Sequence, residues 1–262
     1  MLIRDIRTVF SLAGRAAVVT GAGQGLGRGI AEGFAQFGAE VAVIDIDGQT
    51  ASRVADDINA DGGRAISLTC DVSDQRQAQS AVKEAIQALG KIDILVANAG
   101  IGDRNAAEDM RIEQWDRVLD TNLRGVWLFD QEVGRHMIER GAGGSIVNVA
   151  SVAGLVGLTT GNANYSASKG GVIALTRDLA VEWAQYGIRV NAVAPAQIKT
   201  PLILELIKAK PETEAYFLSK LPLGRLADVE DIVGPVVFLA SDAAAWTTGH
   251  VLVVDGGNLA AF

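Results

Sequence analysis

The sequence predicts an α/β fold with a doubly wound parallel sheet and helices on both faces, and two observations support this prediction. Seven short runs rich in β-branched residues recur along the 262 residues, and most of them are apolar throughout. Strands of this kind are buried on both faces, as in a parallel sheet. The segments between the runs are long enough for crossover helices, and right-handed crossovers place helices on both sides of the sheet.

The expected elements follow one another along the whole chain. The strands are Ala16–Thr20, Glu40–Ile46, Arg64–Cys70, Ile92–Ala97, Gly144–Ala150, Ile188–Val193 and His250–Val254. Apolar residues recur at helical spacing from Asp74 to Leu89, with Gly90 as a stop, and again from Asp228 to Leu239. No internal repeat, low-complexity tract or linker interrupts this order, so residues 1–262 are expected to form a single domain.

One segment, Pro201–Pro222, differs from this pattern. It lies between two expected core elements, carries mixed charge, and contains prolines at both ends and at Pro211. An excursion of this kind is typical of a lid or a substrate loop. We therefore expect it to shape a ligand pocket together with the loop after Ser151 and the residues near Asp103 and Arg104.

The composition excludes several classes of partner. A net charge of −8 and a pI near 4.8 argue against nucleic acid or an anionic membrane as a partner. The chain has no uninterrupted apolar stretch of about 18 residues, so no membrane span is expected. Cys70 is the only cysteine, which rules out an internal disulfide and fits a reducing compartment. A cytoplasmic location is the expectation.

The first strand leads directly into a glycine-rich turn. Glycines at this point allow a tight turn and close approach of the backbone to a pyrophosphate, and the following helix offers free N–H groups. With 30 glycines in the chain, the spacing alone is a weak signal, but the strand before it and the helix after it are the expected context. The turn predicts a dinucleotide site of Rossmann type, with Gly21, Gln24, Gly25, Leu26 and Gly27 as contacts.

Asp45, at the end of the second strand, predicts which dinucleotide binds. A carboxylate there accepts both ribose hydroxyls of the adenosine and repels a 2′-phosphate. Gln24 is neutral, and no Arg or Lys follows Asp45 closely, so NAD is favoured over NADP. Asp45 could instead cap the following helix, although Asp47 is better placed for that role.

Polar residues also follow the third and fourth strands, where ligands of open parallel sheets bind. Asp71 is expected to contact the cofactor rather than only form a turn, whereas a helix cap is as good an explanation for Asp74. Asn98, Ala99 and Gly100 follow the fourth strand and are expected in the same crevice.

Tyr165 and Lys169 are spaced i, i+4, which places them on one face of a helix. A nearby cation favours the phenolate and brings a tyrosine, with an ordinary pKa of about 10, toward acid/base work. The pair alone is weak evidence, since chance produces one with a probability of roughly one in ten, and a surface pair is the alternative. Ser151 strengthens the case, because it ends a strand in the same crevice as the glycine turn.

Two other chemistries are disfavoured. The chain has only two histidines, His136 and His250, and neither lies in a triad or nucleophile-elbow context that would make Ser151 a hydrolase nucleophile. The same scarcity of His and Cys argues against a catalytic metal site.

Together these residues resemble the short-chain dehydrogenase/reductase family over almost the entire chain. The matching positions are Thr20 to Gly27, Asp45, Asp71, Ala97 to Gly100, Asn122, Ser151, Tyr165, Lys169, Arg189 to Asn191, Pro195, Ile198, Thr200 and Val254 to Gly257. Three features depart from the family pattern: Ala97 replaces an asparagine, Ala196 replaces a glycine, and the segment from Ser151 to Tyr165, with the loop Gly161–Asn164, is about one residue longer than expected.

The resemblance implies a role for each group in a hydride transfer between a substrate carbon and nicotinamide. Tyr165 would be the general acid/base and Ser151 would orient the reacting oxygen. Lys169 would lower the pKa of Tyr165 and bind the nicotinamide ribose, while Asn122 would hold a water in a proton relay. The resemblance places Asp71, Val72, Pro195, Ile198 and Thr200 among the cofactor contacts, with Ile198 and Thr200 on the carboxamide side, and it counts Tyr165 and Lys169 among these contacts as well.

A narrower resemblance is to galactitol and related polyol dehydrogenases. It rests on Arg7 to Phe10 before Leu12, on Lys210 to Glu212, and on Pro222 to Arg225. The family also implies a homotetramer paired through the helix of Tyr165 and the helix before it.

Three hypotheses follow. The leading one is an NAD-dependent enzyme that interconverts a secondary alcohol, such as a sugar alcohol, and its ketone. A 3-oxoacyl thioester reductase is the alternative, but it would more often use NADPH, and Asp45 and Gln24 weigh against it. A non-catalytic dinucleotide sensor would be expected to have lost Tyr165 or Lys169, and both are present.

Overall fold

The computed structural model describes residues 5–158 and 161–261, the side chains of Arg7 and Leu202 excepted, and its centre is one sheet. The sheet has seven strands in the order β3-β2-β1-β4-β5-β6-β7, and every neighbouring pair is parallel. The strands are β1 Ala16–Thr20, β2 Glu40–Asp45, β3 Arg64–Thr69, β4 Ile94–Ala97, β5 Gly144–Val149, β6 Ile188–Pro195 and β7 Val251–Val254. The predicted doubly wound sheet is confirmed, with strand ends that differ by one or two residues.

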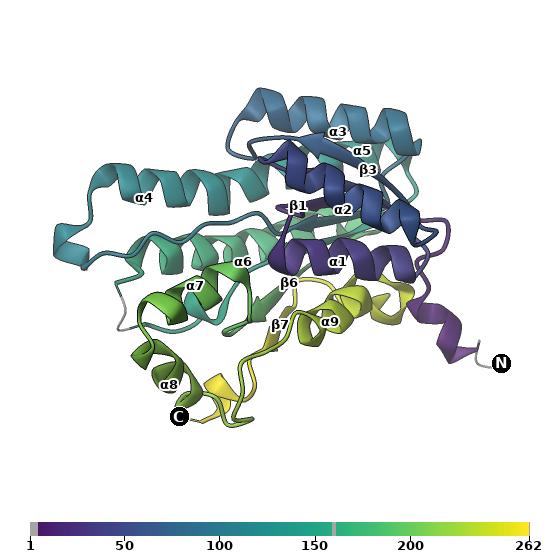
Figure 1. The fold of residues 1–262 in the computed structure, drawn as a ribbon. Coiled ribbons are helices and arrows are strands. Elements are labelled where there is room, and N and C mark those ends of the chain that lie inside the picture. The colour runs from purple at the N-terminus through teal and green to yellow at the C-terminus, as the bar shows by residue number, and fades with distance from the viewer. Residues whose placement is uncertain (1–4, 159–160, 262) are drawn as a thin grey trace.

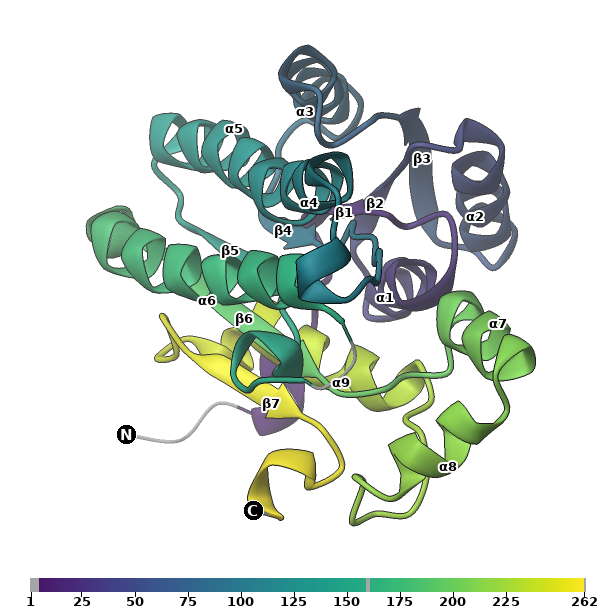
Figure 2. The same cartoon turned by 90° about the vertical axis from the view of Figure 1, so that its left-hand side faces the viewer.

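Helices cover both faces of the sheet, and each layer encloses its own apolar core (Figures 1 and 2). One layer consists of α1 Gly25–Gln36, α2 Gly48–Ala60 and α9 Glu230–Ala240. The other consists of α3 Gln75–Leu89, α5 Gly125–Arg140 and α6 Ala163–Trp183, and α4 Ile112–Leu119 lies beside α6. Because β1 pairs with β2 on one side and with β4 on the other, the residues that follow it emerge inside the sheet's carboxyl edge, away from both ends of the sheet.

Asp47 and Asp74 cap the helices that follow the second and third strands. The Asp47 carboxylate accepts hydrogen bonds from the backbone N–H groups at the start of α2, and Asp74 does the same for α3. Gly90 ends α3 in the left-handed conformation, with φ +79°. The capping roles considered for Asp47 and Asp74 are thus present, and Asp45 is left for another role.

The excursion Pro201–Pro222 folds into two helices, α7 Pro201–Ala209 and α8 Glu212–Leu218, rather than an open loop. Pro201 occupies the first turn of α7, where a missing N–H costs nothing, and Pro211 separates the two helices. Phe217, Leu221 and other apolar residues of this segment form a small core of their own. Figure 2 shows α7 and α8 at one side of the molecule, apart from the two helical layers.

None of the helices in the described ranges combines the length and the apolarity that a bilayer-spanning segment requires.

Candidate active site

The glycine turn after β1 can be formed only with glycines at its key positions. Gly21 and Gly25 adopt left-handed conformations, with φ +62° and +56°. A Cβ on Gly27 would lie 2.1 Å from the carbonyl oxygen of Gly21, closer than two such atoms can approach. The start of α1 therefore packs directly on the turn, and its backbone is open to a ligand.

The N-terminus of α1 differs from those of α2 and α3 because no side chain caps it. Gln24 occupies the cap position in an extended conformation and makes no capping hydrogen bond. The first N–H groups of the helix are thus left without the carboxylate that serves them in the neighbouring helices. Backbone N–H groups that no side chain caps, at the positive end of a twelve-residue helix, suit the phosphates of a dinucleotide.

Asn98 braces this turn from the neighbouring strand. Its Nδ2 donates to the carbonyl oxygens of Thr20 and Gly21, at 2.9 and 3.0 Å. The Thr20 hydroxyl in turn accepts the backbone N–H groups of Asn98 and Ala99. Asn98 lines the expected groove, but its amide hydrogens are engaged by the protein, so it acts mainly by holding the turn in shape.

A groove of about 830 Å³ extends from Asp45 past the glycine turn to Gly100. Twelve of the predicted cofactor contacts line it: Gly21, Gln24, Gly25, Leu26, Gly27, Asp45, Asp71, Val72, Asn98, Ala99, Gly100 and Thr200. The other four, Tyr165, Lys169, Pro195 and Ile198, line an adjoining cleft of about 430 Å³, which shares Leu26, Asn98, Gly100, Ile101 and Thr200 with the groove. The two spaces form one continuous site across the carboxyl edge of the sheet.

Asp45 and Asp71 both point their carboxylates toward backbone donors. Asp45 accepts the N–H groups of Gly23 and Asp47, at 2.8 and 3.0 Å. Asp71 accepts the backbone N–H and the hydroxyl of Ser73. Asp71 thus stabilises a turn, which was the alternative to a cofactor contact, and it also lines the groove.

Ser151, Tyr165 and Lys169 meet in the adjoining cleft. Ser151 lies two residues after β5, at the start of the short 3-10 turn Val152–Gly154 that packs against α6, and Tyr165 and Lys169 lie in the first two turns of α6. A hydrogen bond joins the Ser151 and Tyr165 side chains. The Lys169 ammonium donates to the carbonyl oxygen of Val149 at 2.6 Å and lies 5.8 Å from the centre of the Tyr165 ring.

The electrostatics of the pair differ from the expectation. Burial raises the pKa of Tyr165, and the hydrogen bond from Ser151 and the charge of Arg104 oppose this effect in part. Burial also lowers the pKa of Lys169, to about 8. The phenol of Tyr165 therefore does not have the lowered pKa that the i, i+4 pair predicted, because desolvation outweighs the hydrogen bond from Ser151 and the charge of Arg104.

Asn122 lies in a π-helical turn, Asp120–Arg124, that joins α4 to α5. The side chain is fully buried. Its Oδ1 accepts the N–H of Ile101 at 2.8 Å, and its Nδ2 donates to the Ile101 carbonyl and the Ser168 hydroxyl. Both amide hydrogens are engaged by the protein, so the side chain ties the Ile101 backbone to the helix of Tyr165 and Lys169.

Two residues that the sequence did not single out complete this framework. Ser168 links Asn122 to Tyr165, since its hydroxyl also donates to the Tyr165 carbonyl at 2.8 Å. Its position three residues after Tyr165, on the same helix face, was the available signal. Asn164 donates to the carbonyls of Asp103 and Gln114, 61 and 50 residues away in the chain, and no local pattern reveals such a bridge.

One of the two histidines has a structural role. His136 accepts the backbone N–H of Ile92 through Nε2. Across the described ranges, no three His, Cys, Asp or Glu side chains gather as ligands for a metal ion.

A groove suited to a dinucleotide that leads to a Ser–Tyr–Lys cluster is an arrangement expected of an oxidoreductase, and the sequence comparisons agree. The chain belongs to the short-chain dehydrogenase/reductase family: residues 21–258 match the family model described as enoyl-(acyl carrier protein) reductase. It is accordingly a dehydrogenase/reductase that acts on CH–OH groups with a nicotinamide dinucleotide.

Its relatives include enzymes of sugar and polyol metabolism. The chain is 42% identical over 248 residues to an L-rhamnose 1-dehydrogenase (NAD(P)(+)) of Sphingomonas sp., covering 94% of this chain and 96% of that one. It is 41% identical over 249 residues to a D-threitol dehydrogenase of Mycolicibacterium smegmatis, covering 95% and 94%. Among solved structures, a gluconate 5-dehydrogenase from Burkholderia cenocepacia in complex with NADP and tartrate is 35% identical, with a TM-score of 0.91 and coverage of 97% and 98%.

Proposed function

We propose that this protein is an NAD-dependent dehydrogenase that interconverts a secondary alcohol of a small polyhydroxylated compound and its ketone. The observation that carries the proposal is the continuous site described above. Asp45 lies at its adenosine end, and Ser151, Tyr165 and Lys169 lie together at its catalytic end.

Each catalytic side chain has a proposed role that follows from its position. Tyr165 removes the proton of the alcohol during oxidation and returns it during reduction. Ser151 hydrogen-bonds the same substrate oxygen and orients it. The dinucleotide supplies the hydride acceptor or donor when bound. Lys169 holds the ribose of the dinucleotide through its ammonium group. Asn122 holds the backbone of Ile101 in place relative to the helix that carries Tyr165.

The charges around the groove support NAD rather than NADP. The acidic residues that line it are Asp45, Asp71, Glu113, Asp116 and Asp120. Arg117 is the only basic residue among the described residues that line it, and it pairs with Asp103. A 2′-phosphate would bring about two further negative charges beside Asp45 without a cation to receive them.

A cofactor-selectivity assay tests this point. Asp45→Ser should lower kcat/KM for NAD by about 10-fold or more and leave that for NADP unchanged or higher, because the ribose acceptor and its charge are both removed. Lys83→Ser, an exposed substitution on α3, is the control. If Asp45→Ser keeps the selectivity of the parent protein, another group discriminates between the dinucleotides.

A second cavity, which opens from the catalytic cleft on the side away from the groove of the glycine turn, supports a polyhydroxylated substrate. The sugar and polyol dehydrogenases among the relatives support it as well. Asn162, Ser166 and Tyr216 line this cavity and offer hydrogen-bonding groups to hydroxyls. The relatives named above act on rhamnose, threitol and gluconate. A 3-oxoacyl thioester reductase remains the second candidate because the matching family model carries an acyl-carrier description.

A spectrophotometric screen for NADH formation with alditols, secondary alcohols, hydroxy acids and 3-hydroxyacyl thioesters tests the function. We expect turnover with a polyhydroxylated compound. Tyr165→Phe should reduce kcat by at least about 100-fold while NADH binding remains measurable by fluorescence titration. Turnover confined to thioesters would establish the second candidate, and NADH binding without turnover of any class would favour a sensor.

The proposal extends to the organisation of the protein. We propose that residues 1–262 act as one catalytic domain, with Pro201–Pro222 as its substrate segment, in a homotetramer in the cytoplasm. Exposed apolar side chains support association, notably Trp127 on α5, Val181 on α6 and Trp246. Light scattering on the purified protein measures the assembly directly, and a monomer would contradict it.

A further inference from the structure

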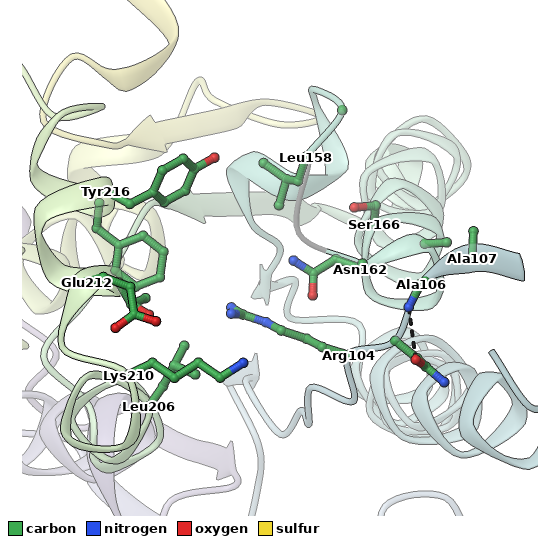
Figure 3. A pocket seen from close by; sticks show the side chains of 16 residues that line it. Arg104, Ala106, Ala107, Leu158, Asn162, Ser166, Leu206, Lys210, Glu212 and Tyr216 are labelled. Carbon is green, nitrogen blue, oxygen red and sulfur yellow. Dashed lines mark hydrogen bonds between the residues drawn. The ribbon is translucent and has the colours of Figure 1, made fainter. Parts of the chain in front are cut away.

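The catalytic cleft opens outward into a second cavity, of about 1040 Å³, between the Arg104 segment, the start of α6 and the α7–α8 pair (Figure 3). Arg104, Leu158, Asn162, Leu206 and Phe217 line both spaces, so they lie at the passage between them. A substrate held at Tyr165 would therefore extend toward this cavity.

Arg104 is the charged side chain common to both spaces. The catalytic cleft is lined by two cations, Arg104 and Lys169, and by no acidic side chain among its described residues. Lys169 is assigned to the cofactor in the proposed function. Arg104 is close enough to the reacting groups for its charge to act on Tyr165, which lowers the pKa of the phenol.

The backbone on both sides of Arg104 is held firmly. Asn164 donates to the carbonyl of Asp103 at 3.0 Å, and the N–H of Asn105 donates to the carbonyl of Gly161 at 3.0 Å. The Asp103 carboxylate is itself held by Gln114 and Arg117. These contacts fix the base of the Arg104 side chain relative to the helix that carries Tyr165.

The guanidinium at the other end has no partner in the described protein. No hydrogen bond or ion pair joins Arg104 to another described residue, whereas Arg117, Arg135 and Arg140 all pair with carboxylates. Figure 3 shows Arg104 extending into the cavity, with the Lys210 side chain pointing toward it from the opposite wall. Arg104 and Lys210 are both exposed, and in a protein of net charge −8 two cations that face one cavity without a carboxylate partner among the described residues favour an anion as its ligand.

We propose that Arg104, assisted by Lys210, binds a carboxylate of the substrate, so that the compound oxidised at Tyr165 is a polyhydroxy acid rather than a neutral polyol. The proposal rests on the proposed function and names the substrate class of the same site. Arg104 is a specificity residue, since it binds a part of the substrate that does not react.

Glu212, the third charged residue that lines the cavity, favours an anion with a single negative charge. Glu212 points into the same space, so the charged side chains that line the cavity sum to +1: Arg104 and Lys210 against Glu212. A single carboxylate matches that charge. A phosphate, which carries nearly two negative charges at neutral pH, would meet the Glu212 carboxylate without a further cation.

Matched pairs of acids and polyols test the proposal. D-gluconate and D-glucitol, D-galactonate and galactitol, and D-xylonate and xylitol each share a carbon chain and differ in the carboxylate. We expect the preferred acid to exceed its partner polyol in kcat/KM by about 10-fold or more. Arg104→Met should lower kcat/KM for the acid by about 10- to 100-fold more than for the polyol, mainly through KM, while a loss shared by both substrates reports the charge that Arg104 exerts on Tyr165.

Three further variants separate binding from folding. Arg104→Lys keeps the charge and should recover part of the loss, and Lys210→Met should give a smaller loss for the acid alone. Lys83→Met, on the outer face of α3, changes the net charge as Arg104→Met does and should leave both substrates unaffected. Equal losses for acid and polyol in Arg104→Met would show that Arg104 does not recognise the carboxylate, which overturns the proposal.

The outcome can be distinguished from failure of the proposed function. Turnover of polyols with no preference for their acids would overturn the carboxylate site and leave the dehydrogenase assignment intact. If no compound is turned over, calorimetric titration of D-gluconate into the complex with NADH decides the point. Binding that is weakened at least about 10-fold by Arg104→Met, but not by Lys83→Met, supports the site, and absent or unchanged binding overturns it.

Discussion

Lys169 lies buried in the catalytic cleft, where its charge has a cost to folding. The residue is only 3% exposed and burial lowers its pKa from 10.5 to about 8. A difference of about 2.5 pKa units corresponds to about 3 kcal/mol of unfolding free energy lost at neutral pH. We therefore expect Lys169→Met to abolish turnover and stabilise the protein. Methionine fills nearly the same volume without a charge.

The expected gain in unfolding free energy is smaller than the full cost of burying the Lys169 charge. The variant also loses the hydrogen bond from the ammonium to the Val149 carbonyl, which is worth about 1 kcal/mol. The net increase in unfolding free energy should therefore be about 2 kcal/mol at pH 7. Urea unfolding at one fixed protein concentration, without cofactor, measures it.

The pH dependence provides the decisive control. Below pH 8 both the folded and the unfolded protein carry a protonated lysine, so the penalty of the parent protein is fully present. Between pH 8 and 10.5 only the unfolded state holds the proton, and the stability of the parent protein rises with pH. The advantage of Lys169→Met should shrink over this range and vanish above it. A variant that is less stable than the parent at pH 7 would show that the ammonium is stabilised by its surroundings, which refutes the reasoning.

Two further predictions concern a buried acid and the glycine turn. Asp130 is fully buried, its pKa is raised to about 8 by burial, and its Oδ1 and the Oδ1 of its partner Asn148 have no hydrogen-bond donor in the described structure. The neutral acid is the favoured folded form, so its stabilising effect is present below pH 4 and is lost as the pH rises through 8. Asp130→Asn should match the parent protein near pH 4 and exceed it by a few kcal/mol at pH 7 in urea unfolding; an equal or lower stability at pH 7 would contradict a protonated Asp130. Gly27→Ala should weaken NADH binding by about 10-fold or more and lower the melting temperature, because its Cβ would lie 2.1 Å from the Gly21 carbonyl oxygen. Gly234→Ala, a glycine replacement on α9 with open space around it and an ordinary helical backbone, should bind NADH normally, and equal affinity in Gly27→Ala would mean that the turn can shift.

The sequence by itself determined the features that depend on local pattern. Apolar runs of strand length predicted the parallel sheet, because a strand buried on both faces needs nonpolar side chains at every position. The glycine turn was predictable because only glycine tolerates the left-handed conformations of Gly21 and Gly25. Tyr165 and Lys169 were placed on one face by helical geometry alone.

Tertiary structure alone decided the features that join distant segments or depend on burial. The π-helical turn at Asn122 and the bridge from Asn164 to the Arg104 segment link residues far apart in sequence, so no periodicity records them. Pro201–Pro222 became two helices because its apolar residues pack on one another and on Leu226, a contact that spacing does not predict. The electrostatics of the catalytic pair were decided in the same way. A cation near a phenol lowers the pKa of the phenol in principle. In the cleft, however, burial raises the pKa of Tyr165 overall, since desolvation depends on everything packed around the group.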